Sequence, residues 1–146
     1  MEVTYKTAQK AKEFGFQEKC FGFYDSDRNL QTIEDIIEMK GDSIKYYYRT
    51  LNTPKWMKEM CSAPTQDQLR TWLRNKYKID CNACWSYNDD KKWSGQCYFL
   101  DDRSEIDSLI RISFIDFPNE NNGLFETYED ALEETLFYAL DLINKE

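Results

Sequence analysis

Apolar residues recur at helical spacing in three parts of the chain, residues 4–14, 65–77 and 127–143. In each part they form one stripe, with lysine, arginine or glutamate on the other sides, as in a helix that covers a core. The side chains expected to face the core are Ala8, Ala11, Phe14, Leu69, Trp72, Leu73, Tyr77, Ala131, Leu132, Leu136, Ala139, Leu140 and Ile143.

The ends of these helices carry local signals of their own. Gly15 suits the left-handed residue that follows a helix C-terminus. Thr65 and Gln68 have the spacing of a capping box, in which each side chain bonds to the backbone N–H of the other residue. Thr127 and Asp130 repeat that spacing at the start of the last helix. The sequence therefore predicts three capped helices.

Between the helices, runs rich in aromatic and β-branched residues are broken by clusters of Asp, Asn, Ser and Gly, a pattern typical of strands and turns. The expected strands cover residues 20–24, a return strand from 30, and residues 43–49, 79–87, 95–100 and 109–115. Strands joined by short turns, with helices between groups of strands, favour an α+β fold. We expect a single domain over residues 1–146, with one antiparallel sheet of about four to six strands and three helices packed mainly on one face.

The turn at residues 25–29 has a second interpretation. Asp25, Asp27 and Asn29 resemble the start of a calcium-binding loop. Such a loop requires glycine at its sixth position and glutamate at its twelfth, and here those positions hold Leu30 and Ile36. Both requirements fail, so we expect a hairpin turn, for which Asp and Asn are common residues.

Composition and charge narrow the function classes. The chain has 146 residues, of which 41% are hydrophobic and 16% aromatic, which excludes a disordered chain. No apolar run approaches the roughly 18 residues of a membrane span, and no leader segment is apparent, so a soluble protein is expected. The net charge of −8 is concentrated in residues 101–146, which carry 3 basic and 13 acidic side chains. This acidity disfavours direct nucleic-acid binding, and either serves solubility or attracts a basic partner.

Five cysteines and the absence of a leader indicate free thiols in a reducing compartment. Cys81 and Cys84 form a CxxC motif that could, with Cys61 and Cys97, make a four-thiolate zinc site. Residues three apart on a strand point to opposite faces, however, and the glycine turn of a zinc knuckle is missing. A redox CxxC normally opens a helix, and that context is missing too. We therefore expect structural cysteines and no metal.

Three segments together resemble a known group of proteins. They are Gly15-Phe16 with Cys20-Phe-Gly-Phe-Tyr-Asp, the run from Ala63-Pro64-Thr65 to Trp72-Leu73-Arg74, and Tyr128-Glu-Asp-Ala-Leu-Glu-Glu134 with Ala139-Leu140. The chain is similar along most of its length to small accessory proteins encoded by phages and mobile elements of gut bacteria. The resemblance implies a cytoplasmic protein of the bacterial host that modulates host functions, including immune systems, and it implies no catalytic residues.

The residues themselves argue against an enzyme. The chain has no histidine, which removes the commonest general base. It has no glycine-rich phosphate loop either. The adjacent pairs Asp89/Asp90 and Asp101/Asp102 could hold Mg²⁺, but such loop carboxylates are usually solvated. We expect no catalytic residues and no cofactor.

Two binding functions remain. The preferred hypothesis is a protein-interaction module whose acidic helix face, Glu129, Glu133 and Glu134, meets a basic host protein or mimics DNA. The alternative is a small-molecule binder that sequesters a nucleotide-type signal, because Lys and Arg bind phosphates and aromatic rings stack on bases. Its candidate residues are Lys45, Tyr47, Arg49, Trp56, Trp85 and Trp93. No membrane partner is expected, and homo-oligomerisation is left open.

Overall fold

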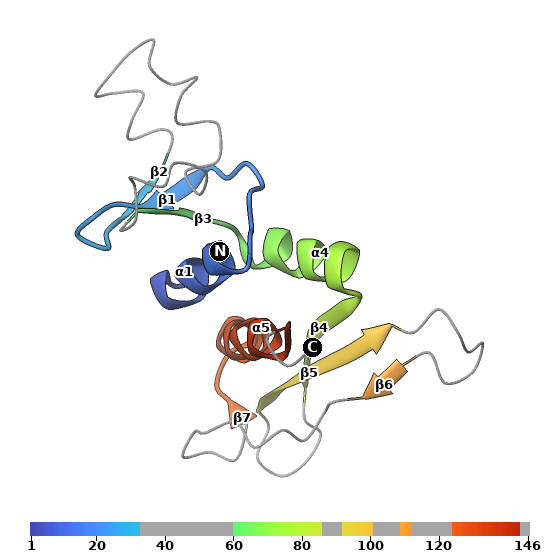
Figure 1. Ribbon diagram of the computed structural model, residues 1–146. Helices are drawn as coiled ribbons and strands as arrows, with labels where there is room; N and C mark the ends of the chain where they lie inside the picture. Colours follow the sequence, from blue (N-terminus) through green and yellow to red (C-terminus); the bar gives the residue numbers. More distant parts are fainter. Residues whose placement is uncertain (33–59, 86–91, 101–108, 112–123, 144–146) are drawn as a thin grey trace. The chain divides into compact units, whose positions relative to one another are not determined.

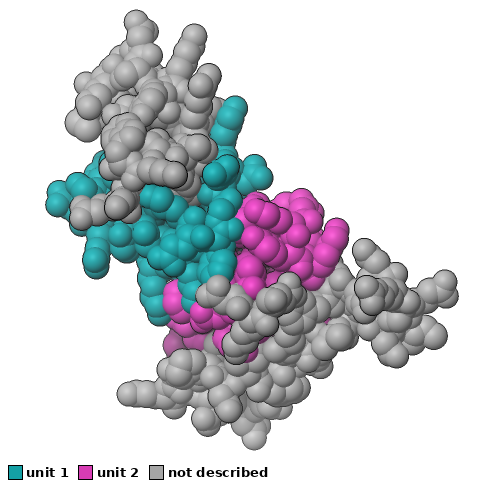
Figure 2. Space-filling view, viewed as in Figure 1, with its two compact units in different colours: residues 1–68 teal, residues 69–146 magenta. Residues whose placement is uncertain are grey.

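The computed structural model describes residues 1–32, 60–85, 92–100, 109–111 and 124–143 (Figure 1). In these ranges the chain forms three helices and two antiparallel sheets, which confirms the predicted α+β class. The expectation of one sheet was wrong, because the described strands are divided between a three-stranded and a four-stranded sheet. The chain separates into two compact units, residues 1–68 and 69–146 (Figure 2).

The first unit contains the three-stranded sheet, in the order β2-β1-β3. Its strands are β1 (Gly22–Tyr24), β2 (Leu30–Thr32) and β3 (Cys61–Ala63). The central strand pairs with both neighbours in antiparallel register, so that Phe23 lies opposite Gln31 on one side and Ser62 on the other. The pairing of β1 with β2 confirms the predicted hairpin. The strand predicted at residues 43–49 lies outside the described residues.

Helix α1 (Tyr5–Glu13) packs against β3 and ends as the sequence predicts. Gly15 has a φ of 90°, in the left-handed region that favours glycine. Its N–H donates to the Lys12 carbonyl at 3.0 Å, and the Phe16 N–H donates to the Ala11 carbonyl at 2.9 Å. This pair of bonds is a Schellman motif, and it places the Phe16 side chain fully in the core.

The turn between β1 and β2 is organised by one carboxylate. Asp25 Oδ1 accepts the backbone N–H groups of Asp27 and Asn29, each at 2.9 Å. These bonds, chiefly the one from Asn29, lower the pKa of the Asp25 carboxyl. Arg28 has a φ of 65°, so the turn carries a left-handed residue. The acidic cluster at residues 25–29 is thus a hairpin turn, as predicted.

Helix α4 (Gln66–Tyr77) starts in the first unit and continues into the second. The predicted capping box is present in full, because the Thr65 N–H donates to Gln68 Oε1 at 2.9 Å and the Gln68 N–H donates to Thr65 Oγ1 at 3.1 Å. Of the predicted stripe, three members are buried and Tyr77 is half-buried. The buried members are Leu69, Trp72 and Leu73.

The second unit contains the four-stranded sheet. Its strands are β4 (Ile79–Trp85), β5 (Trp93–Leu100), β6 (Leu109–Arg111) and β7 (Leu124–Phe125). β5 is central, with β4 on one side and both β6 and β7 on the other. It begins at Trp93, two residues before the predicted start, because Trp93 and Ser94 pair with both β4 and β7. The two-residue strand β7 was not predicted.

Helix α5 (Tyr128–Ile143) packs on β4 and β5. Its predicted cap is present, since the Asp130 N–H donates to Thr127 Oγ1 at 3.0 Å. The predicted apolar stripe is buried except for Ile143, which is half-buried at the helix end. The buried face also contains Thr135, whose hydroxyl lies so close to Gly95 that a Cβ built there would be 1.8 Å from Oγ1.

Candidate interaction surface

Three aromatic rings form a row where β4, β5 and α5 meet at one end of the second unit's sheet. Trp85 and Trp93 are cross-strand partners, and their ring centroids are 5.2 Å apart in an edge-to-face arrangement at 72°. Trp93 makes a second such contact with Tyr128, the first residue of α5, at 5.3 Å and 84°. Trp85, at the outer end of the row, is 39% exposed. Edge-to-face contacts of this kind hold the rings in place beyond simple area burial.

Acidic side chains follow the row along the start of α5. Glu126 is exposed and pairs with Lys92, whose Nζ lies 3.0 Å from Oε1. Asp130 is also exposed, whereas Glu129, Glu133 and Glu134 are half-buried. The expected fully outward position of these three glutamates is thus not observed, because the buried face of α5 is wide and they lie on its flanks. We call the combined set the aromatic–acidic surface, defined by Trp85, Trp93, Tyr128, Glu126, Glu129, Asp130, Glu133 and Glu134.

The structure brings together only some of the candidate residues. Trp85 and Trp93 are in direct contact, and Trp93 touches the helix that carries Glu129, Glu133 and Glu134. Sequence reasoning missed Tyr128, because its role depends on a contact between residues 35 positions apart, for which the local sequence contains no signal. The remaining nucleotide candidates, Lys45, Tyr47, Arg49 and Trp56, lie outside the described residues. So do the carboxylate pairs Asp89/Asp90 and Asp101/Asp102.

The basic side chains of α4 are partly engaged within their own unit. Arg74 donates to Asp80 Oδ1 through Nη2 at 2.7 Å and through Nε at 3.1 Å. Arg70 Nε lies 3.8 Å from the same oxygen. The Lys76 ammonium lies 5.3 Å from the centre of the Trp72 ring, within the range of a cation–π contact. The Asp80 carboxylate offsets part of the positive charge that α4 presents to an anionic ligand.

All five cysteines are free thiols, as predicted. Burial raises the pKa of the Cys20 and Cys61 thiols to about 12. In the second unit, the Cys81 and Cys97 sulfurs are 3.7 Å apart in the core between β4, β5 and α5. The pKa of the Cys81 thiol is raised, chiefly by its hydrogen bond with Cys97 and next by burial. Thiols with a raised pKa are protonated at neutral pH and are poor nucleophiles.

The CxxC motif has the geometry expected of a strand. Cys81 is buried under α5, whereas Cys84 is half-buried on the opposite face, where its thiol donates to Gln96 Oε1 at 3.3 Å. The two sulfurs therefore point away from each other. Among the residues that the structure describes, no group of three or more His, Cys, Asp or Glu side chains has the arrangement of a metal site.

Comparisons with known proteins leave the function to be argued from this geometry. No protein family, curated protein or solved structure matches the chain. Of the helices in the described ranges, none has the length and apolar character to cross a bilayer.

Proposed function

We propose that the chain acts by binding a basic protein partner through the aromatic–acidic surface, without catalysing a reaction. The observation that carries this proposal is the position of Trp93, which contacts both Trp85 and Tyr128. Trp93 thereby joins a partly exposed aromatic row to the acidic start of α5. Aromatic anchors with a charged rim are the usual composition of an energetically strong interface.

The aromatic row supplies the anchor. Tryptophan and tyrosine are enriched among the few interface residues that carry most binding energy. Trp85 is 39% exposed, so part of the residue is accessible to a partner. Its neighbours restrict its motion, so little conformational entropy is lost when a partner binds. An arginine or lysine of the partner could also lie over the indole face, which favours cations.

The acidic side chains of α5 form the rim of this surface and supply charge complementarity to a basic partner. Glu129 with Glu133, and Asp130 with Glu134, are like-charge pairs four residues apart on α5. Each such pair destabilises a helix by about 0.2–0.5 kcal/mol. A basic partner would be drawn to the surface by long-range attraction to these four carboxylates. The resemblance to phage and mobile-element proteins makes a host protein in the bacterial cytoplasm the expected partner.

The experiment has two stages. Immobilised chain is first exposed to a lysate of a gut bacterium at low and at high salt, and retained proteins are identified by mass spectrometry. A purified retained protein is then titrated against the wild type and against Trp85→Ala. We expect Trp85→Ala to weaken binding by about 2 kcal/mol, or roughly 30-fold. Failure to retain any protein at low salt, or equal affinity of the two proteins, contradicts the proposal.

Matched variants separate the aromatic and acidic contributions. Leu30→Ala removes a side chain that is 41% exposed in the first unit, and it should leave binding unchanged. The triple variant Glu129→Gln/Glu133→Gln/Glu134→Gln should slow association and flatten the salt dependence. Its control, Glu18→Gln/Asp27→Asn/Asp67→Asn, removes the same charge from exposed positions in the first unit. If both triple variants slow association equally, the acidic rim has no specific role.

The nucleotide hypothesis remains a prediction, since four of its six candidate residues lie outside the described part of the chain. A thermal-shift screen of the wild type against linear and cyclic nucleotides tests it. No stabilisation by any of them would remove it.

A further inference from the structure

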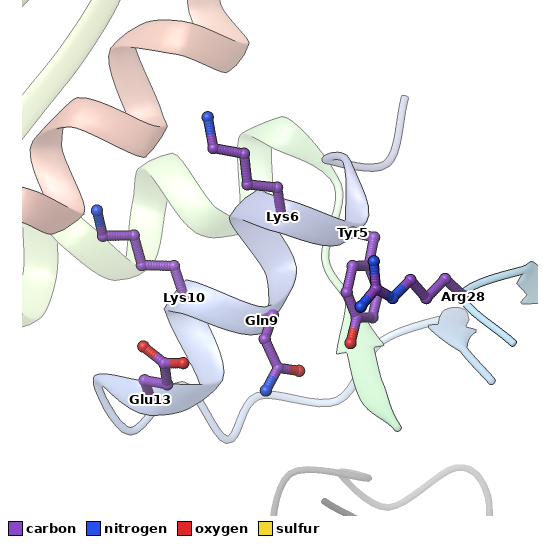
Figure 3. A pocket seen from close by; sticks show the side chains of 6 residues that line it. All are labelled: Tyr5, Lys6, Gln9, Lys10, Glu13 and Arg28. Carbon is purple, nitrogen blue, oxygen red and sulfur yellow. The ribbon is translucent and has the colours of Figure 1, made fainter. Parts of the chain in front are cut away.

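A second candidate site lies in the first unit, on the outer side of α1, and it is independent of the aromatic–acidic surface. A hollow of about 590 Å³ is lined by Tyr5, Lys6, Gln9, Lys10, Glu13 and Arg28 (Figure 3). The hollow is shallow and largely open to solvent, so a ligand there would be held mainly from one side. The lining contains three cations and one carboxylate, in a protein whose net charge is −8. The hollow is therefore locally basic.

The cationic part of the hollow is held in place by the fold. The Arg28 guanidinium lies over the Tyr5 ring, with its central carbon 5.0 Å from the ring centroid. The Tyr5 ring in turn packs edge-to-face on Tyr24 at 5.5 Å. Figure 3 shows the guanidinium lying across the ring at one end of the hollow. A guanidinium positioned in this way presents a planar fork of N–H donors that suits a phosphate group.

The Gln9 side chain carries the observation that points to a ligand. Its Oε1 atom is buried and has no hydrogen-bond partner among the described residues. An unpaired buried acceptor destabilises a protein, and native structures rarely keep one without a reason. In Figure 3 the Gln9 side chain leaves α1 between Glu13 and the Tyr5–Arg28 pair. Because this oxygen is enclosed, the Gln9 amide must turn before a hydroxyl or N–H donor of a ligand in the hollow can reach it.

Glu13, which also lines the hollow, offers a second acceptor for the donors of a ligand. Carboxylates commonly accept hydrogen bonds from the hydroxyl groups of a ribose. The hollow thus presents phosphate-binding donors at the Arg28 end and two acceptor groups, Gln9 and Glu13, along α1. We propose that this hollow binds a small organic phosphate that carries hydroxyl or N–H donors, the chemistry shared by sugar phosphates and nucleoside monophosphates.

The test uses the full chain and four kinds of probe: ribose 5-phosphate, the four common nucleoside 5′-monophosphates, adenosine and inorganic phosphate. Binding is measured by calorimetry and by the NMR shift of the Gln9 side-chain amide. We expect ribose 5-phosphate or a nucleoside monophosphate to bind with a Kd below about 1 mM. Equal affinity for both means that the sugar phosphate is recognised, and tighter binding of a nucleotide means that the base contributes.

Two variants and one control assign the binding to the hollow. Arg28→Gln should weaken binding about tenfold, the effect expected when a charged hydrogen bond is lost. Lys78→Gln is its control, because Lys78 is also an exposed basic residue with a left-handed backbone, at φ 57°, and does not line the hollow. Gln9→Leu should weaken binding severalfold while raising the Tm of the ligand-free protein, since it removes the unpaired acceptor. A Gln9 with a merely structural role would not produce these opposite effects.

Three results would overturn the proposal. The first is that neither class of organic phosphate binds. The second is that inorganic phosphate or adenosine alone binds as tightly as the organic phosphates, because the phosphate and the donors would then not be recognised together. The third is that Arg28→Gln and Gln9→Leu bind the probes as the wild type does, which would place the site elsewhere.

Discussion

Substituting Gly95 by alanine tests how closely α5 approaches the sheet. Gly95 lies on β5 opposite Ala83, and its φ is outside the left-handed region, so the backbone itself accepts alanine. The new Cβ would meet Thr135 Oγ1 at 1.8 Å, and both Thr135 Cβ and the Ala131 carbonyl oxygen at 3.2 Å. The first distance is physically impossible. Rotating the threonine relieves it but leaves the other two contacts tight.

The size of the expected loss of stability follows from the atoms that must move. Thr135 is fully buried, and its hydroxyl donates to the Ala131 carbonyl at 2.6 Å. Rotation breaks this bond and leaves a buried hydroxyl unpaired, at a cost of about 1–3 kcal/mol. Overpacking of the remaining contacts adds about 1–3 kcal/mol. Replacing glycine by alanine also restricts the unfolded chain, which stabilises the folded protein by about 0.4–1 kcal/mol. We expect Gly95→Ala to lower the free energy of unfolding by about 2–4 kcal/mol.

The assay is urea unfolding followed by tryptophan fluorescence, with Gly22→Ala as the matched control. Gly22 is also a strand glycine, but a Cβ there would meet its nearest neighbour, Leu30 Cδ1, at an ordinary 3.4 Å. We expect the control to be neutral or slightly stabilising. Adding Thr135→Ala to Gly95→Ala should recover part of the loss, because the 1.8 Å clash disappears while the 3.2 Å contacts remain. If Gly95→Ala unfolds at the same urea concentration as Gly22→Ala, the close approach of α5 to β5 is refuted.

Two further predictions concern titration. Burial raises the pKa of Cys20 and Cys61 to about 12 from a reference of 9.0, so the thiols of the unfolded chain lose their protons at a lower pH than those of the folded chain. The contribution of these thiols to the free energy of unfolding is therefore fully present below about pH 9 and falls as the pH rises toward 12. The slope is up to about 1.4 kcal/mol per pH unit per thiol. Urea unfolding at several alkaline pH values should show a flatter decline for Cys20→Ser/Cys61→Ser than for the wild type, and identical slopes would contradict the assignment. Because backbone donors lower the pKa of Asp25, its support for the hairpin is present above its reference pKa of 3.8 and is lost as pH falls through the lowered value. The amide NMR signals of Asp27 and Asn29 should therefore move together, with a midpoint below 3.8, and separate midpoints at or above that value would be inconsistent with the shared Oδ1 acceptor.

The features that the sequence predicted well are those encoded within a few residues. The capping box at Thr65 and Gln68 and the Schellman ending at Gly15 each depend on residues no more than five positions apart. The Asp25 turn belongs to the same class. In each case the residue type and its spacing specify the hydrogen bonds, so tertiary packing has little opportunity to override them.

The features that escaped prediction depend on distant partners. β1 pairs with β3 although the two strands are separated by more than 30 residues, and this pairing divides the strands between two sheets. Trp93 meets Tyr128 for a similar reason, and that contact defines the candidate surface. Thr135 is polar, so its place in the core of α5 is understandable only once Gly95 is seen beneath it. Periodicity reports which face of an element is apolar, but it does not report what covers that face.

The central position of β5 also has a consequence for how the second unit opens. This strand bonds to β4, β6 and β7 and lies against α5, so its amides cannot be released by fraying at an edge. Amide protons on such a strand exchange with solvent only when the whole cooperative unit opens. The exchange rates at Tyr98 and Phe99, which pair with both β4 and β6, would therefore report the global unfolding of this unit. The rates at β7 would report local breathing next to Trp93, on the side of the molecule where a partner is expected to bind.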